Sequence, residues 1–318
     1  MKHPLGVTLA ALVPLTLSSL MTGAASVDVF AAPSDPWAML VLMESRLPRT
    51  LAVLLTGAAL AVAGMLLQAL VRNRFVGPDT VGTGESAALG LLAITLLAPG
   101  APIWVKILTA AASAMAGTAL FVAVIRRLPP RELMLVPITG IVLSGVIGSV
   151  VTYIAWQTDL IQLITTWLMT GEFSGVIAGR YEILWIAGGA AALAWFAADR
   201  FAILGLGEEV ATGLGLGTKG VMRLGLAVVS LVTAMVVATV GMIPFIGLVV
   251  PNIVSRIMGD NLRQSLPMVA AAGAALLMAC DLIGRLVRYP FEIPVGTVMG
   301  FVGAGIFLFI LYRKPAHG

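Results

Sequence analysis

Long apolar stretches, separated by short polar or glycine-rich breaks, fill almost the whole chain. A helix needs about 20 apolar residues to cross the hydrocarbon core of a bilayer. On that measure the pattern predicts ten transmembrane helices, at residues 5–24, 50–71, 81–98, 103–125, 132–155, 183–199, 221–240, 243–258, 266–284 and 294–312. The segments 183–199 and 243–258 are short for complete spans. The predicted fold class is all-α and polytopic, with residues 1–318 forming a single transmembrane domain.

Two further apolar segments need separate interpretations. Residues 161–178 are predicted to form an interfacial or partly inserted helix, because another full span would disturb the charge pattern of the loops. The run from Leu5 to Met21 precedes Ala24-Ala25-Ser26, which is similar to a signal-peptidase site. Apolar regions of signal peptides are about 7–15 residues long. This run is longer, so it is predicted to be a retained first span.

A polar and glycine-rich loop at about 205–218 interrupts the apolar pattern. It contains the stretch Gly207-Glu208-Glu209-Val210-Ala211-Thr212-Gly213-Leu214-Gly215. Leu206, Val210 and Leu214 recur at every fourth position, so a short helix here would present one apolar face. The glutamates stand at its start, which suits the positive end of the helix dipole.

This short helix has three possible roles. It can lie on the lipid surface, dock onto another protein, or simply connect two spans. A helix on a lipid surface favours Lys or Arg on its polar face, whereas this one carries Glu208 and Glu209. The sequence therefore favours protein docking over a plain connecting loop.

Composition agrees with the membrane class and excludes others. The chain is 59% hydrophobic and only 11% charged, whereas soluble proteins carry about 25% charged residues. Its basic residues are scattered singly, which argues against a nucleic-acid partner. Cys280 is the single cysteine, so no intrachain disulfide forms. His3 and His317 are terminal, which excludes a His-ligated metal or haem site within the membrane.

The basic residues predict the orientation of the spans, because cytoplasmic loops carry an excess of Lys and Arg. With the N-terminus inside, the inner set is Lys2, Arg72, Arg74, Arg126, Arg127, Arg131, Arg200, Lys219, Arg223, Arg256, Arg263, Arg313 and Lys314. The outer set is Arg46, Arg49, Lys106, Arg180, Arg285 and Arg288. This asymmetry places both termini and the 205–218 loop in the cytoplasm. A partner that docks on that loop is then cytoplasmic.

Four of the outer cations form two pairs. Arg46 and Arg49 flank a proline at the mouth of the second span, and Arg285 and Arg288 lie at the outer end of the ninth. Arginine forms bidentate pairs with carboxylates, so both pairs suit an acidic extracytoplasmic partner. Anchoring of the spans at lipid headgroups explains them equally well.

Two predicted spans carry small residues at helical spacing. One stripe is Gly140, Ser144, Gly148 and Thr152, and the other is Gly296, Gly300 and Ala304. Such stripes allow close helix packing, which is their commoner use, or they line a passage for a bulky solute.

Two polar or irregular features fall within the apolar region. The segment from Gly241 to Asn252 holds two prolines, which predicts a bent or broken helix, either near a moving part or as a static kink. Glu85 lies about one turn inside the third span. An acid there is a functional candidate by default, although pairing with Arg72 or Arg74 explains it as well.

No motif for ATP hydrolysis or covalent catalysis is present. In the run from Gly213 to Lys219, Thr218 separates the last glycine from the lysine, so the run is not a Walker A loop. Nor does the sequence offer a set of nucleophile and base. We expect no enzymatic activity, and we expect this chain to bind no cofactor.

Several short motifs in order resemble the FecCD-type permeases of bacterial ABC importers for iron chelates and vitamin B12. They are Arg46-Leu47-Pro48-Arg49, the segment from Gln68 to Pro78, Gly207-Glu208 with Ala211 and Leu214-Gly215, the segment from Ile243 to Pro251, Asp281-Leu282-Ile283-Gly284-Arg285, and Glu292-Ile293-Pro294-Val295-Gly296. The resemblance covers nearly the whole chain.

The resemblance implies a ten-span permease subunit of the cytoplasmic (inner) membrane that pairs with a second permease subunit, either a copy or a paralogue. It implies that cytoplasmic ATP-binding subunits dock on Gly207, Glu208, Glu209, Ala211, Leu214 and Gly215. It also implies that an extracytoplasmic substrate-binding protein docks at Arg46, Arg49 and Arg285. The pathway would be lined by Gly140, Ser144, Gly148, Thr152, Gly296 and Gly300.

The cargo is predicted from departures and similarities within the family. The family usually has a histidine where this chain has Asn252. The third span of the family commonly starts with a glycine-rich stretch, which is changed here to Gly82-Thr83-Gly84-Glu85-Ser86. Together with Arg72-Asn73-Arg74-Phe75-Val76, this resembles the ferric-siderophore branch, the catecholate type in particular. The alternatives are a haem or vitamin B12 permease, an ion-coupled secondary transporter and, least favoured, a membrane-embedded enzyme.

Overall fold

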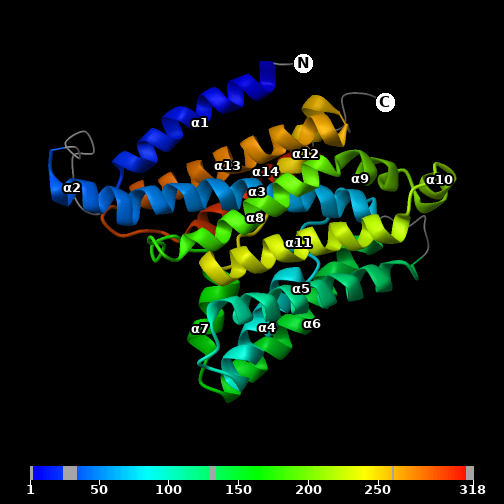
Figure 1. Ribbon diagram of the computed structural model, residues 1–318, viewed down its shortest axis with the longest axis horizontal. Coiled ribbons are helices and arrows are strands. Elements are labelled where there is room, and N and C mark those ends of the chain that lie inside the picture. The colour runs from blue at the N-terminus through cyan, green and yellow to red at the C-terminus, as the bar shows by residue number, and fades with distance from the viewer. Residues whose placement is uncertain (1–2, 24–33, 129–133, 260, 313–318) are drawn as a thin grey trace.

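A computed structural model of the chain describes residues 3–23, 34–128, 134–259 and 261–312 (Figure 1). The helices are α1 (His3–Met21), α2 (Pro36–Val41), α3 (Leu47–Val71), α4 (Thr83–Leu97), α5 (Ile103–Ile125), α6 (Leu135–Gln157), α7 (Ile161–Thr165), α8 (Leu184–Phe196), α9 (Ala198–Gly205), α10 (Glu208–Gly213), α11 (Thr218–Val240), α12 (Ile246–Met258), α13 (Leu262–Leu286) and α14 (Val295–Tyr312). Within these residues there is no strand. The possible cleavage site Ala24-Ala25-Ser26 and the cations Lys2, Arg131, Arg313 and Lys314 lie outside the described residues.

Each of the ten predicted spans corresponds to a helix, but the helices differ in length. Seven helices are long and apolar enough to cross a membrane, or eight if the bent pair Tyr181–Phe196 and Ala198–Gly205, which meets at 65°, is one span. The helices α4 and α12 have only 15 and 13 residues. The all-helical membrane fold is therefore confirmed, and the count of ten spans stays a prediction.

The second predicted span starts earlier than its apolar pattern suggests. The helix runs without a break over Pro36–Val71, through a π-helical turn at Leu42–Arg46. Pro48 follows this turn and supplies no N–H, and the carbonyl of Glu44, four residues before it, accepts a hydrogen bond from the Ala178 N–H instead. Arg46 and Arg49 consequently lie on a continuous helix and not in a loop at the mouth of the span.

The segment predicted at 161–178 is only partly helical. It forms α7, followed by a π-helical turn at Thr166–Thr170 and a non-helical stretch. Backbone hydrogen bonds tie this segment to its neighbours: the Met242 N–H donates to the Trp167 carbonyl, and the Gly296 N–H donates to the Gly171 carbonyl. It therefore packs on the end of α11 and the start of α14.

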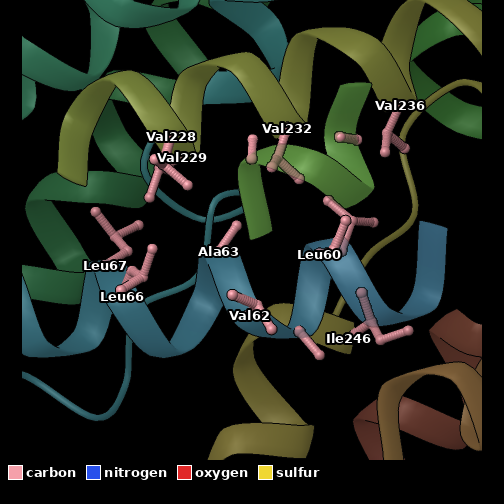
Figure 2. Packing of buried hydrophobic residues seen from close by; sticks show 14 of the residues in the cluster. Leu60, Val62, Ala63, Leu66, Leu67, Val228, Val229, Val232, Val236 and Ile246 are labelled. Atoms are coloured by element: carbon pink, nitrogen blue, oxygen red, sulfur yellow. The ribbon is translucent and has the colours of Figure 1, made fainter. Parts of the chain in front are cut away.

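Helix α3 lies at the centre of the packed core. Figure 2 shows its residues Leu60, Val62, Ala63, Leu66 and Leu67 beside Val228, Val229, Val232 and Val236 of α11 and Ile246 of α12. In the apolar window of this span 78% of the residues are buried, against 11% in α6. The core is thus built around α3, and α6 leaves most of its surface open to lipid or to a partner.

Two glycines allow α3 to touch its neighbours backbone to backbone. A Cβ atom on Gly64 would lie 1.9 Å from the carbonyl oxygen of Gly247 in α12. A Cβ atom on Gly57 would lie 2.5 Å from the carbonyl oxygen of Gly273 in α13. Small residues at such crossings bring helix axes close in membranes, where van der Waals packing holds helices together.

The helices α4 and α12 begin beside irregular backbone inside the bundle. The Gln68 amide donates to the carbonyl of Val76, and the Asn252 amide donates to the carbonyl of Arg74, each bond holding the loop 72–82. Asp79 of that loop accepts a hydrogen bond of 2.8 Å from the Phe245 N–H, just before α12. Burial raises the pKa of Asp79, and this hydrogen bond partly opposes the effect. Side chains thus satisfy backbone groups that no helix pairs, as buried irregular backbone requires.

The contact of Gly64 with Gly247 gives a stability prediction. Gly64→Ala should lower the free energy of unfolding by about 2–3 kcal/mol, because the added methyl group meets backbone atoms that cannot rotate away. The midpoint of thermal unfolding in detergent measures the loss. Gly189→Ala in α8 is the matched control, since its Cβ would meet no atom within 4 Å. Equal midpoints for the two variants would contradict this account of α3.

Candidate functional site

The short helix α10 projects from one end of the bundle (Figure 1). It is shorter than the sequence pattern suggested, because Leu206 closes α9 and Gly207 precedes α10. The side chains of Leu206, Val210 and Leu214 are nevertheless 66%, 48% and 65% exposed. Ala211 is fully buried and faces the bundle. All three aliphatic residues are therefore exposed, but only Val210 lies within α10: Leu206 ends α9 and Leu214 follows α10.

An exposed ion pair and two glycines surround α10. The Arg126 guanidinium, at the end of α5, lies 2.6 Å from the Glu208 carboxylate, and both side chains are about half exposed. Gly207 has a φ of 121°, which favours glycine, and a Cβ there would lie 3.3 Å from Arg72 Nη1. Gly215 has a φ of 78° and allows the chain to turn into α11. Glu209 is exposed.

The opposite end of the bundle holds a buried ionic cluster. The Arg49 guanidinium donates to both carboxylate oxygens of Glu292 and to Asp281 Oδ1, each at 2.8 Å. The second oxygen of Asp281 lies 2.5 Å from Arg285 Nη2. The exposed fractions of the side chains are 14% for Arg49, 1% for Asp281 and 27% for Glu292. The cluster ties α3 and α13 to the loop that precedes α14.

Arg285 and Arg46 extend this cluster to α1. Arg285 donates to the carbonyls of Ser19 and Thr22 and to the Ser19 hydroxyl. Arg46 donates to the carbonyl of Leu20 at 2.9 Å. Cationic donors suit the unpaired carbonyls of a helix C-terminus. Because Arg46 and Arg285 are only 6% and 5% exposed, both are occupied within the protein, whereas Arg180 and Arg288 at the same end are exposed.

A groove of about 650 Å³ opens along α6. It is lined by Glu85, Ser144, Gly145, Gly148, Ser149, Thr152, Tyr153, Trp156 and Leu168. Three members of the predicted small-residue stripe therefore line it together with Glu85. We call this cavity the α6 groove.

The other predicted lining residues have different surroundings. A Cβ on Gly140 would lie 2.5 Å from the Thr80 carbonyl oxygen, so this glycine serves close packing. Gly296 packs on Gly171, which accepts its backbone hydrogen bond at 3.0 Å. A Cβ on Gly300 would meet nothing within 4 Å. The two stripes thus combine packing positions with open ones.

Glu85 does not pair with Arg72 or Arg74 within the described residues. Instead the Ser144 hydroxyl donates to Glu85 Oε1 at 2.5 Å. Oε2 is buried and accepts no hydrogen bond from the described residues. The acid therefore lies between α4 and α6, beside the α6 groove.

Sequence reasoning missed most of the ionic cluster. Arg49 lies far from Asp281 and Glu292 along the chain, so no local pattern joins them. The one available signal was the i, i+4 spacing of Asp281 and Arg285, which brings two side chains together on a helix. No group of three or more His, Cys, Asp or Glu side chains in the described residues is arranged to hold a metal ion.

Comparisons with known proteins agree with this architecture. The sequence matches the FecCD transport family over residues 8–313. It is 41% identical to the petrobactin import system permease protein YclN of Bacillus subtilis, over 87% of each chain. It is 38% identical to the ferric-anguibactin transport system permease protein FatD of Vibrio anguillarum, over 94% of this chain and 95% of that one.

A solved structure shows the same fold. It is described as an inward-facing metal-chelate type ABC transporter, and it superposes with a TM-score of 0.81 over 97% of this chain and 98% of that chain, at 24% identity.

The buried ionic cluster gives a second stability prediction. Asp281→Asn should lower the free energy of unfolding by about 3–5 kcal/mol, because two buried guanidinium groups then lose their shared charge partner. Thermal unfolding in detergent measures the loss. Glu292→Gln is the control: its side chain is partly exposed and Arg49 keeps Asp281, so a loss of about 1 kcal/mol is expected. Equal midpoints of thermal unfolding for Asp281→Asn and Glu292→Gln would contradict this account of the cluster.

Proposed function

The chain belongs to the FecCD transport family, and we propose that it is the membrane subunit of an ATP-driven importer that carries a ferric siderophore across the cytoplasmic membrane. The observation that carries this proposal is its similarity, over most of the chain, to permeases named for petrobactin and ferric anguibactin. A permease subunit of this family is not an enzyme, because the ATPase is a separate subunit. The iron travels inside its chelate, so no protein ligands for iron are needed.

The proposed contact with the ATP-binding subunits is α10. Three exposed aliphatic residues, Leu206, Val210 and Leu214, lie in or directly beside α10, and burial of such side chains in a groove favours docking. The end that carries α10 also carries the larger set of predicted inner cations, which supports a cytoplasmic position. Placement of both termini in the cytoplasm follows from the same charge argument and is part of the proposal.

The proposed docking surface for the substrate-binding protein is the opposite end, at Arg46, Arg49 and Arg285. Since Arg46 and Arg285 already bind carbonyls of α1, they support this surface from below. Arg49 is reached only past Glu292, whose carboxylate holds it. The exposed Arg288 is then the cation that an acidic partner meets first.

A second permease subunit, identical or paralogous, is proposed to pair with this one along α6 and α14, with the α6 groove facing the shared pathway. Both helices present large apolar side chains to the outside, among them Val146 and Phe301. An interface that encloses the groove would separate the cargo from lipid.

Replacing one exposed side chain of α10 tests the coupling and the transport function. Leu214→Ser should reduce the ATPase subunit that co-purifies with the permease by about tenfold, because it removes apolar contact area. Uptake of the ferric siderophore into proteoliposomes, measured with ATP and the loaded binding protein present, should fall in parallel.

Ile103→Ser is the control for this test, since Ile103 is also an exposed aliphatic residue but stands at the start of α5, at the opposite end. Normal co-purification of Leu214→Ser would remove the coupling role. Uptake of haem or vitamin B12 in place of the siderophore would change the cargo, and uptake without any ATPase subunit would indicate a secondary transporter.

Reversing the exposed cation tests the outer docking surface. Arg288→Glu should raise the Kd for an acidic binding protein by about tenfold at low salt, and less at high salt, because exposed charges are screened. Arg223→Glu, an exposed arginine of α11 near the opposite end, should leave this Kd unchanged. Equal affinities of the wild type and Arg288→Glu would exclude Arg288 from the docking surface.

A further inference from the structure

The carboxylate of Glu85 has an unusual charge environment beside the α6 groove. Its Oε1 atom is held by Ser144, and its Oε2 atom is buried without a hydrogen-bond partner among the described residues. The lining of the groove includes no Lys or Arg within the described part of the chain. No lysine or arginine among the described residues that line the groove therefore balances the charge of Glu85.

A glycine of α6 faces Glu85. A Cβ on Gly148 would lie 3.6 Å from Glu85 Cγ. Hydroxyl groups of Ser144, Thr152 and Tyr153 line the same groove. The wall near Glu85 thus presents one acid and several groups that accept hydrogen bonds, beside the apolar Trp156 and Leu168.

The chemistry of this wall selects the kind of cation that fits. A hard divalent metal ion takes six or more oxygen ligands, several of them charged, and one carboxylate does not supply them. An alkylammonium group carries one charge and donates up to three hydrogen bonds. The Oε2 atom of Glu85 has no hydrogen-bond partner within the described residues but is buried, so an amine reaches it only if the side chain turns towards the groove; the carboxylate and the nearby hydroxyl groups then match those donors.

We propose that Glu85 is a specificity-determining residue of the transport pathway, which receives a protonated amine of the ferric chelate as the chelate passes the α6 groove. The inference rests on the proposed function, because it needs an iron chelate as cargo. Glu85 attracts a chelate that carries a free amine, and it disfavours a chelate whose groups are all anionic, since like charges repel in a groove of low dielectric constant.

The test compares two cargoes that differ in one charge. The complete transporter is reconstituted in proteoliposomes, and its binding protein is saturated with a ferric siderophore that bears a free primary amine, or with the same chelate acetylated at that amine. The readout is the ratio of the two initial uptake rates. We expect the wild type to favour the free amine by about tenfold, the usual size of one charge-assisted hydrogen bond.

The variants separate a charge effect from a structural one. Glu85→Gln keeps an oxygen for Ser144 but removes the charge, so the ratio should fall towards one. Glu85→Asp keeps the charge and should retain most of the preference. Glu182→Gln is the control, because Glu182 is an exposed acid outside the lining of the groove, and it should leave the ratio unchanged.

Three results would overturn the inference. One is a wild-type ratio near one, and another is a Glu85→Gln variant that slows both cargoes equally while the ratio persists. The third is a complete wild-type transporter that takes up neither chelate with ATP. That result refutes the proposed function itself, whereas the first two leave siderophore import standing.

Discussion

The backbone contact of α3 with α12 and α13 is the constraint on which the rest of the structure depends. Gly64 meets Gly247, and Gly57 meets Gly273, so α3 is held on two sides without intervening side chains. A helix of 25 residues is about 37 Å long. Its first turn carries Arg49 of the ionic cluster, and Arg72, directly after its last residue, lies beside Gly207 at the start of α10. One rigid helix therefore joins the two ends at which partners are proposed to dock.

The structure is stabilised by different interactions at the two ends of α3. At the end that carries Arg49, buried charges satisfy one another: Asp281 pairs with Arg49 and Arg285, and Arg285 also donates to carbonyls of α1. Such a network fixes geometry strictly, because movement of any member leaves a buried charge unpaired. At the opposite end, apolar side chains in and beside α10 are exposed, and Glu208 forms a half-exposed ion pair with Arg126. Ion pairs of this kind contribute little, so the position of α10 is easily changed by a partner.

The sequence carried part of this structure and not the rest. The length of each apolar run predicted every long helix, and the aliphatic residues Leu206, Val210 and Leu214 are exposed, although a break at Gly207 keeps Leu206 out of the helix that contains Val210. Both signals are local. The start of the second predicted span was missed, because the π-helical turn before Pro48 continues this helix towards the N-terminus. The cluster at Arg49 was missed because its partners come from distant segments. Of the small-residue stripe on α6, Gly140 packs on the loop at Thr80 whereas the other members line the groove, a difference that periodicity does not reveal.

The long helices are not equally buried. Helices α3, α4, α5, α11, α12 and α13 contribute to one continuous buried core, whereas α6 and α7 lie to the side of α11, away from α1 and α13 (Figure 1). Of these, α6 has few buried residues and borders the groove that contains Glu85. Regions with few buried contacts open at a lower free energy than a packed core. Helix α6, which borders the proposed pathway, is therefore expected to rearrange more easily than α3, which keeps the two proposed docking ends in register.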